Sequence, residues 1–156
     1  MSQLNISELM SEELIIDELS SRTKMDVLKE FSSLLYDNRK IDDREGLTSI
    51  LAAREALGST GIGDSVAIPH GKLKGLKSMV LAFGRSKSGI DYDSLDGGPA
   101  HLFFLMLAPE EAPGEHLKAL ARISRLMKNP AFRDALMRAS DRKEMKKIIL
   151  QEEARL

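Results

Sequence analysis

The chain has 156 residues, of which 42% are hydrophobic and 30% charged, and this length suits one globular domain with its own core. Its 23 Lys and Arg residues nearly balance 24 Asp and Glu residues, which argues against nucleic acid as the main partner. The absence of cysteine excludes disulfide scaffolds and thiolate chemistry, and no apolar run reaches the roughly 18 residues that a membrane span needs.

Apolar periodicity and turn residues predict strands interleaved with helices. The predicted elements are, in chain order, a strand over 14–19, a helix from Ser21 or Thr23 to Asn38, a helix from Asp42 or Asp43 to Gly58, a strand over 66–68, a strand over 78–84, a short edge piece over 90–92, a strand over 101–108, and helices over 114–128, 132–139 and 141–153. The 101–108 segment is almost wholly apolar, which is typical of a central strand. We therefore expect an α/β sandwich of two or three layers, with a mixed parallel and antiparallel sheet flanked by helices.

The strongest functional signal lies between Arg54 and Lys72. His70 stands there between Pro69 and Gly71, at the exit of the strand predicted over 66–68. An imidazole has an ordinary pKa near 6.5, so much of it is neutral and nucleophilic at neutral pH. A reactive nitrogen at a strand end is therefore the favoured interpretation of His70.

The glycine-rich loop that precedes this strand does not match a nucleotide motif. The glycines of Gly58–Gly63 follow a helix and precede a strand, the reverse of a dinucleotide fingerprint, and Gly63 is followed by Asp64 instead of the Lys of a Walker loop. One interpretation is a flexible turn. The favoured one is an anion-holding loop, because glycine lets main-chain N–H groups approach an oxyanion closely. Its candidate phosphate-binding residues are Ser59, Thr60, Gly61 and Gly63.

The remaining histidines and one arginine each allow two interpretations. The three histidines lack the usual metal-ligand spacings, so we expect no metal site. His101 is most simply a polar residue at a strand end. His116 starts the core-facing stripe of its helix, where it is either a packed structural residue or a side chain that emerges at the sheet edge. Arg54 suits the helix dipole in the last turn of its helix, or it reaches a bound phosphate with its guanidinium.

The run from Arg54 through Gly58-Ser-Thr-Gly-Ile-Gly63 to Val66-Ala-Ile-Pro-His-Gly-Lys72 closely resembles the enzyme IIA type 2 domains of the bacterial sugar phosphotransferase system. These are the mannitol- and fructose-type proteins and the nitrogen-regulatory enzyme IIA. The resemblance extends over residues 9–152, which we expect to form a single domain, and includes the strand at 102–107 and the later Glu115–Leu117 helix segment.

The resemblance implies that His70 accepts a phosphoryl group from the phosphocarrier HPr or a close relative. The group then passes to a cysteine of a IIB domain, or it stays as a regulatory mark read by target proteins. By position, Arg54 and His116 match the active-site arginine and second histidine of the family, and Ser59 to Gly63 match the adjacent loop. No metal or cofactor is implied, and His101 has no counterpart that carries a role.

Two functions follow from this family. The sequence of the Gly58–Gly63 loop and the compact chain, which shows no fused transporter, favour the nitrogen-regulatory branch. The alternative is a sugar-specific, fructose- or mannitol-type IIA component that feeds a IIB domain during sugar uptake, and a domain that has lost activity is a third reading. The first nine residues lack a basic start and an apolar run, so we expect a cytoplasmic protein. Apolar helix surface could support a homodimer.

Overall fold

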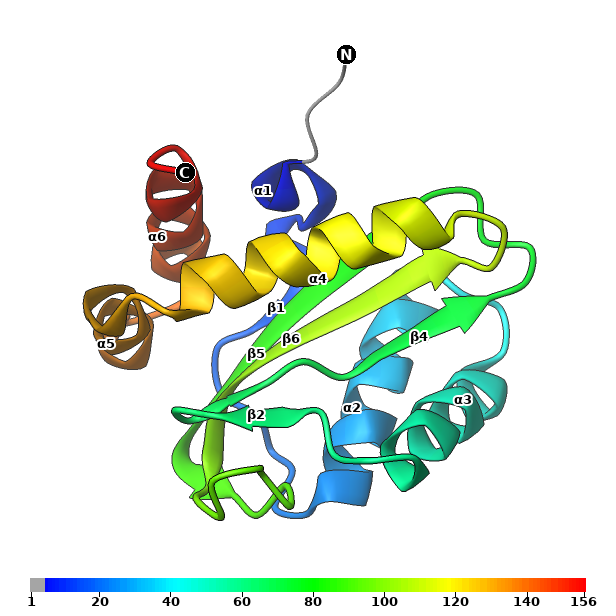
Figure 1. Cartoon of the computed structure of the whole chain (residues 1–156), viewed down its shortest axis with the longest axis horizontal. Helices are drawn as coiled ribbons and strands as arrows, with labels where there is room; N and C mark the ends of the chain where they lie inside the picture. Colours follow the sequence, from blue (N-terminus) through cyan, green and yellow to red (C-terminus); the bar gives the residue numbers. More distant parts are fainter. Residues whose placement is uncertain (1–4) are drawn as a thin grey trace.

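A computed structural model describes residues 5–156, and within them six strands form one mixed sheet with helices on both faces (Figure 1). The strands are β1 (Ile15–Ile16), β2 (Gly61–Gly63), β3 (Val66–Ala67), β4 (His70–Leu73), β5 (Val80–Ile90) and β6 (Ala100–Pro109). The helices are α1 (Ile6–Leu9), α2 (Lys24–Asp37), α3 (Arg44–Ala56), α4 (Pro113–Met127), α5 (Pro130–Arg138) and α6 (Arg142–Glu153), with a 3₁₀ turn at Glu12–Leu14. The expected α/β class with a mixed sheet is confirmed.

Strand β6 lies in the middle of the sheet, as its apolar sequence predicted. The strand order is β1-β5-β6-β3-β2, and β4 also pairs with β6. β5 runs antiparallel to β6, β3 and β4 run parallel to it, and β1 runs parallel to β5. Every residue of β6 is buried except His101, which is partly exposed. Burial on both faces explains why this strand shows no apolar–polar alternation.

β3 and β4 follow one edge of β6 in the same register, with a break between them at Ile68 and Pro69. Val66 lies opposite Leu102 and His70 opposite Met106, so the second pair lies four positions after the first in both strands. His70 is therefore the first residue of β4, which corrects the prediction that it follows a strand into a loop. β4 was not predicted because its sequence does not favour a strand: Pro69 before it cannot donate a ladder hydrogen bond, and Gly71 follows His70.

Side-chain caps fix the starts of the long helices. Thr23 accepts a hydrogen bond from the N–H of Asp26 at 3.2 Å and Asp43 from that of Gly46 at 2.9 Å, so Thr23 and Asp43 are the caps among the predicted alternatives. Asp141 caps α6 in the same way. These caps place α3 so that its last turn ends close to the start of β4.

Two predicted strands have different bounds. The first strand contains only Ile15 and Ile16, because Leu14 belongs to the 3₁₀ turn. The edge piece expected over 90–92 is not separate, because β5 continues to Ile90, which pairs with Ala100 of β6 after an irregular stretch. Pairing with the neighbouring strand carries β5 through a polar segment that local periodicity does not favour.

The two faces of the sheet carry different helices. α4 crosses one face, while α2 and α3 pack on the other (Figure 1). A Cβ added at Gly71 would lie 3.0 Å from Cγ2 of Ile50 in α3, so position 71 faces α3 closely and a side chain there would press against Ile50. Side chains alternate along a strand, which turns His70 toward the α4 face. No helix in residues 5–156 combines the length and apolarity needed to cross a membrane.

Candidate functional site

The ring of His70 is held by a hydrogen bond at each nitrogen. Nδ1 lies 2.8 Å from the carbonyl oxygen of Ile68, and Nε of Arg54 lies 3.3 Å from Nε2. A carbonyl only accepts and a guanidinium only donates, so Nδ1 carries the hydrogen and Nε2 the lone pair. His70 is therefore a neutral imidazole whose Nε2 carries the lone pair. The main-chain carbonyl of Ile68 fixes this tautomer.

Arg54 reaches the site from the last turn of α3, where the sequence placed it. Its Nη1 donates to the carbonyl oxygen of Gly58 at 2.8 Å while its Nε donates to His70. The two contacts use separate edges of one planar group, which orients the guanidinium more firmly than a single contact can. The side chain is partly exposed, so its cationic edge remains available to an anion bound at Nε2.

His116 joins the pair from the first turn of α4. Its ring centroid lies 5.2 Å from that of His70 with an interplanar angle of 62°, and the residue is only 7% exposed. Nδ1 of His116 is buried and finds no hydrogen-bond partner among residues 5–156. The helix packs through the predicted stripe, with Ile123 and Met127 buried. Both interpretations of His116 thus hold in part, since a packed histidine lies against the reactive one.

Burial and neighbouring cations keep both rings neutral. Burial lowers the pKa of His70, the hydrogen bond to Ile68 opposes this, and the charge of Arg54 lowers the pKa further. Burial also lowers the pKa of His116, and so do its repulsion from the protonated form of His70 and the charge of Lys72. Because the ordinary pKa is about 6.5, a lowered pKa leaves Nε2 of His70 unprotonated at neutral pH.

The loop residues predicted to bind phosphate make internal contacts. Thr60 is buried, its N–H donates to Glu55 at 3.0 Å, and its hydroxyl also donates to Glu55. The Ser59 hydroxyl donates to the carbonyl of Tyr92 at 2.7 Å and accepts the N–H of Gly61 at 3.0 Å. These polar groups are occupied within the protein, so the structure gives Ser59, Thr60 and Gly61 the task of fixing the loop in place of meeting an anion directly.

Gly63 has a conformational task in this loop. It adopts a φ of 95°, and the two residues after it, Asp64 and Ser65, have φ values of 54° and 70°. Two successive positive φ angles are typical of the tight hairpin turn that joins antiparallel strands, here β2 and β3. Gly63 therefore serves the turn that leads the chain into β3 and on to His70.

The sequence analysis gave no role to Glu55 or Tyr92, whose polar groups hold the loop between α3 and β2. Glu55 is buried next to Arg54 in α3, and the Tyr92 hydroxyl donates to it at 3.2 Å. A carboxylate one residue before a helix end is buried only where hydrogen-bond donors satisfy it. The partners come from distant segments, which a single sequence does not reveal.

The third histidine lies apart from this cluster. His101 is near the start of β6, five positions before Met106, the residue opposite His70, and its ring lies close to Gly89. Among the residues described, no group of three or more His, Asp and Glu side chains is arranged to hold a metal ion. His101 keeps the structural assignment given by the sequence.

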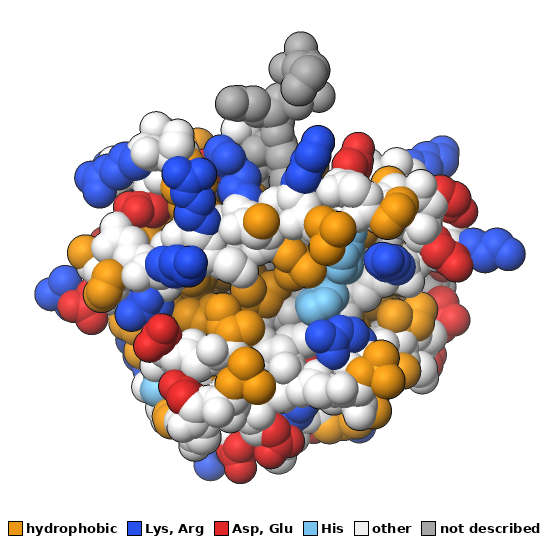
Figure 2. All heavy atoms as spheres, viewed as in Figure 1, with side chains coloured by type: hydrophobic (Ala, Val, Ile, Leu, Met, Phe, Trp, Pro, Cys, Tyr) orange, Lys and Arg blue, Asp and Glu red, His pale blue; other side chains and the backbone are white. Residues whose placement is uncertain are grey.

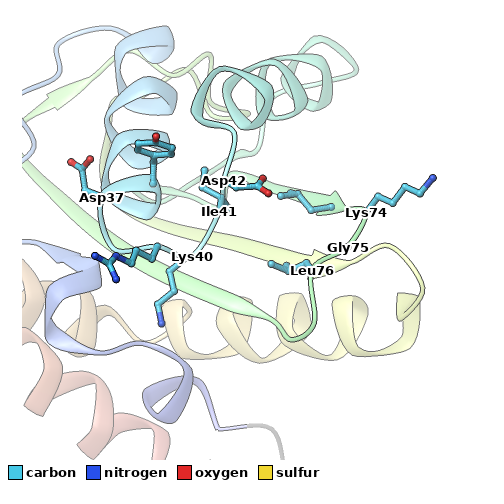
Figure 3. Close-up of a pocket in the computed structure, with 10 residues that line it drawn as sticks. Asp37, Lys40, Ile41, Asp42, Lys74, Gly75 and Leu76 are labelled. Atoms are coloured by element: carbon cyan, nitrogen blue, oxygen red, sulfur yellow. The ribbon is translucent and has the colours of Figure 1, made fainter.

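A hollow of about 790 Å³ lies beyond the other end of β4, between the α2–α3 loop and the β4–β5 turn (Figure 3). It is lined on one side by residues 36–37 and 39–42 and on the other by residues 73–76. None of the three site residues lines it. The histidine cluster instead opens on the surface, where Figure 2, drawn from the same side as Figure 1, shows histidine next to hydrophobic and basic side chains.

Exposed leucines flank the cluster along the chain. Leu57, three residues after Arg54, is 85% exposed, and Leu117, next to His116, is 67% exposed. The fold and site thus define a mixed α/β domain that presents a neutral histidine near its surface, flanked by an arginine and a second histidine.

Comparison with known proteins identifies the family. Residues 8–152 match the family described as phosphoenolpyruvate-dependent sugar phosphotransferase system, EIIA 2. The chain belongs to this family. The resemblance on which the sequence analysis relied is confirmed.

Relatives with two kinds of name are similar to this chain. It is 40% identical over 136 residues to the fructose-specific EIIABC component of Bacillus subtilis (87% of this chain) but spans only 21% of that protein. It is 39% identical over 136 residues to a nitrogen regulatory protein of Bradyrhizobium diazoefficiens, covering 87% of this chain and 88% of that one. The crystal structure of IIA-Ntr from Neisseria meningitidis superposes with a TM-score of 0.86 at 34% identity, covering 92% of this chain and 98% of that one.

Proposed function

We propose that this chain is a phosphohistidine carrier that accepts a phosphoryl group on Nε2 of His70 from a phosphorylated HPr-type protein. The observation that supports it best is the protonation pattern of His70, whose Nδ1 is bound to a carbonyl while Nε2 keeps its lone pair beside Arg54. Membership of the EIIA type 2 family supports the same reaction class. We treat residues 9–152 as the single domain that carries it.

The transfer needs positioning and charge compensation more than covalent work by the protein. The Nε2 lone pair of His70 attacks phosphorus in line with the P–N bond of the donor phosphohistidine. That bond breaks, its electron pair returns to the donor imidazole, and the phosphoryl group becomes attached to His70. Arg54 and His116 stand where the equatorial oxygens arrive, so their N–H groups stabilise charge that grows in the transition state.

The acceptor of the phosphoryl group separates two functions. In the regulatory function the phosphorylation state of His70 controls target proteins, and the Bradyrhizobium and Neisseria relatives, named as nitrogen regulatory proteins, favour this branch because they match the chain over most of their length. In the alternative the chain passes the group to a IIB domain for sugar uptake, which the fructose-specific relative favours. The exposed leucines at the rim suit a protein acceptor in either case.

A reconstituted relay tests both the reaction and the branch. The chain is incubated with phosphoenolpyruvate, enzyme I and either the sugar-type or the nitrogen-type HPr, and the labelled residue is mapped. We expect acid-labile phosphate on His70, faster with the nitrogen-type donor. His70→Ala abolishes labelling, whereas His101→Ala keeps it. Labelling at another residue refutes the site, and a preference for the sugar-type HPr refutes the regulatory branch.

A further inference from the structure

Glu55 lies buried beneath the loop that joins α3 to β2. Its side chain is 5% exposed and faces donors from three segments of the chain. One carboxylate oxygen accepts from the Thr60 N–H at 3.0 Å and from Nζ of Lys24 at 3.0 Å, and the other from the Tyr92 hydroxyl at 3.2 Å and from the Thr60 hydroxyl. A buried carboxylate is unfavourable unless charge and donors satisfy it, and here four donors do so.

A chain of main-chain hydrogen bonds links this carboxylate to the reactive ring. Glu55 fixes Thr60, the carbonyl of Thr60 accepts the N–H of Ile68 at 3.0 Å, and the carbonyl of Ile68 accepts Nδ1–H of His70 at 2.8 Å. The Ile68 peptide lies in the break between β3 and β4, where no ladder partner holds its carbonyl. The N–H of Ile68, bound to Thr60, and the carbonyl of Pro69, which accepts the N–H of Met106 at 3.0 Å, together set the backbone on either side of this carbonyl.

We propose that Glu55 is a positioning residue for phosphoryl transfer, which acts through Thr60 and Ile68 to hold His70 with Nδ1 protonated and Nε2 facing the donor. This inference rests on the proposed function. Glu55 touches neither His70 nor the incoming group. Its task is to keep a loop without regular structure in the one arrangement that presents the Ile68 carbonyl to the ring.

The same carboxylate acts on His70 through its charge. Burial and Arg54 lower the pKa of His70, and the negative charge of Glu55 raises it. The other charged or titratable groups around the two residues are Lys72 and His116 beside His70, and Lys24 and Tyr92 beside Glu55. Neutralising Glu55 therefore lowers the pKa of His70, in addition to the change in tautomer that loss of its positioning role produces.

Glu55→Gln tests the inference, with Glu153→Gln as its matched control. Gln keeps the size of the side chain but offers a single acceptor oxygen to four donors. Glu153 is likewise a buried carboxylate, 5% exposed and paired with Arg122 at 2.8 Å, but it lies in α6 and binds Ile6 and Ser7 of α1. The two variants thus remove comparable buried charges, one under the site and one away from it.

Three readouts are compared in the full chain. We expect Glu55→Gln to slow single-turnover phosphorylation by a phosphorylated HPr about tenfold or more, the kinetic equivalent of one lost charge-assisted hydrogen bond, with an unchanged KM for the donor. Nitrogen NMR shifts of His70 should show a smaller Nδ1-protonated fraction, and its pKa should fall. Glu153→Gln should keep the wild-type rate, tautomer and pKa despite lower thermal stability.

Thr60 supplies a second pair of variants if Glu55→Gln does not fold. Thr60→Val removes the hydroxyl that binds Glu55 and should move the rate and tautomer in the same direction, while Thr60→Ser restores both. Wild-type rate and tautomer in Glu55→Gln, or in Thr60→Val, overturn the inference. If the wild-type chain is not labelled on His70, the proposed function fails, and the tautomer comparison still decides whether Glu55 positions the ring.

Discussion

Arg54→Gln isolates the contribution of the guanidinium at His70. Arg54 donates from Nε to His70 at 3.3 Å and from Nη1 to the Gly58 carbonyl at 2.8 Å. Glutamine is shorter and uncharged, so it cannot make both contacts or compensate an incoming phosphoryl group. Loss of one donor to a developing oxyanion typically costs about 2.7–4 kcal/mol, so we expect the transfer rate to fall by roughly 10²–10³-fold.

The substitution also changes the protonation of His70, and the two effects can be separated by pH. The charge of Arg54 lowers the pKa of His70, so its removal raises that pKa and leaves fewer neutral rings near pH 6. At pH 8.5, two units above the ordinary imidazole pKa of about 6.5, about 99% of such rings are neutral. A rate loss that persists at pH 8.5 therefore measures the missing donor.

Single-turnover phosphorylation by labelled phospho-HPr, quenched over a range of times at pH 6.0 and 8.5, measures both effects. Arg44→Gln is the control, because Arg44 begins the same helix at its far end. The control should transfer at the wild-type rate at both pH values. If Arg54→Gln reaches the wild-type rate at pH 8.5, Arg54 only adjusts the pKa of His70, and its assignment to transition-state stabilisation is wrong.

Three further outcomes are expected. His116→Ala should keep the fold but slow onward transfer from phosphorylated His70, measured with a IIB acceptor, and a wild-type rate would remove His116 from the mechanism. Both histidine pKa values are lowered on folding, so the unfolded chain binds more protons around pH 6.5 and below, and the free energy of unfolding should decrease as the pH is lowered through that range. Denaturant unfolding should show a shallower pH dependence in a variant that lacks both rings. Glu153→Gln should lower the free energy of unfolding by about 1–3 kcal/mol and speed hydrogen exchange in α1, because its carboxylate accepts the first N–H groups of that helix; unchanged exchange would show that α1 is held by other contacts.

The sequence predicted those features that rest on local pattern. The helix caps at Thr23 and Asp43, the central β6 and the place of Arg54 in the last turn of α3 each follow from periodicity or from a residue type suited to its position. The motif around His70 pointed to the reactive ring, because proline and glycine beside a histidine are informative even in a single sequence.

What the sequence did not predict depends on contacts between distant segments. β4 exists because β6 offers it a partner edge, although its own four residues carry little strand preference. The hydroxyls of Ser59 and Thr60 were expected to face an anion, and they bind Tyr92 and Glu55 instead, the first of which lies more than thirty positions away. Polar loop residues look alike in sequence whether their donors turn outward or inward.

The gap in pairing between β3 and β4 has a consequence for how this site tolerates change. The atom that sets the proton on His70 belongs to the main chain at position 68, and every amino acid there supplies the same oxygen. Drift in that side chain can therefore alter packing without altering which nitrogen reacts. Substitution at position 68 therefore leaves the tautomer of His70 unchanged. Substitution of residues that set the path of the backbone around position 68 is expected to change it.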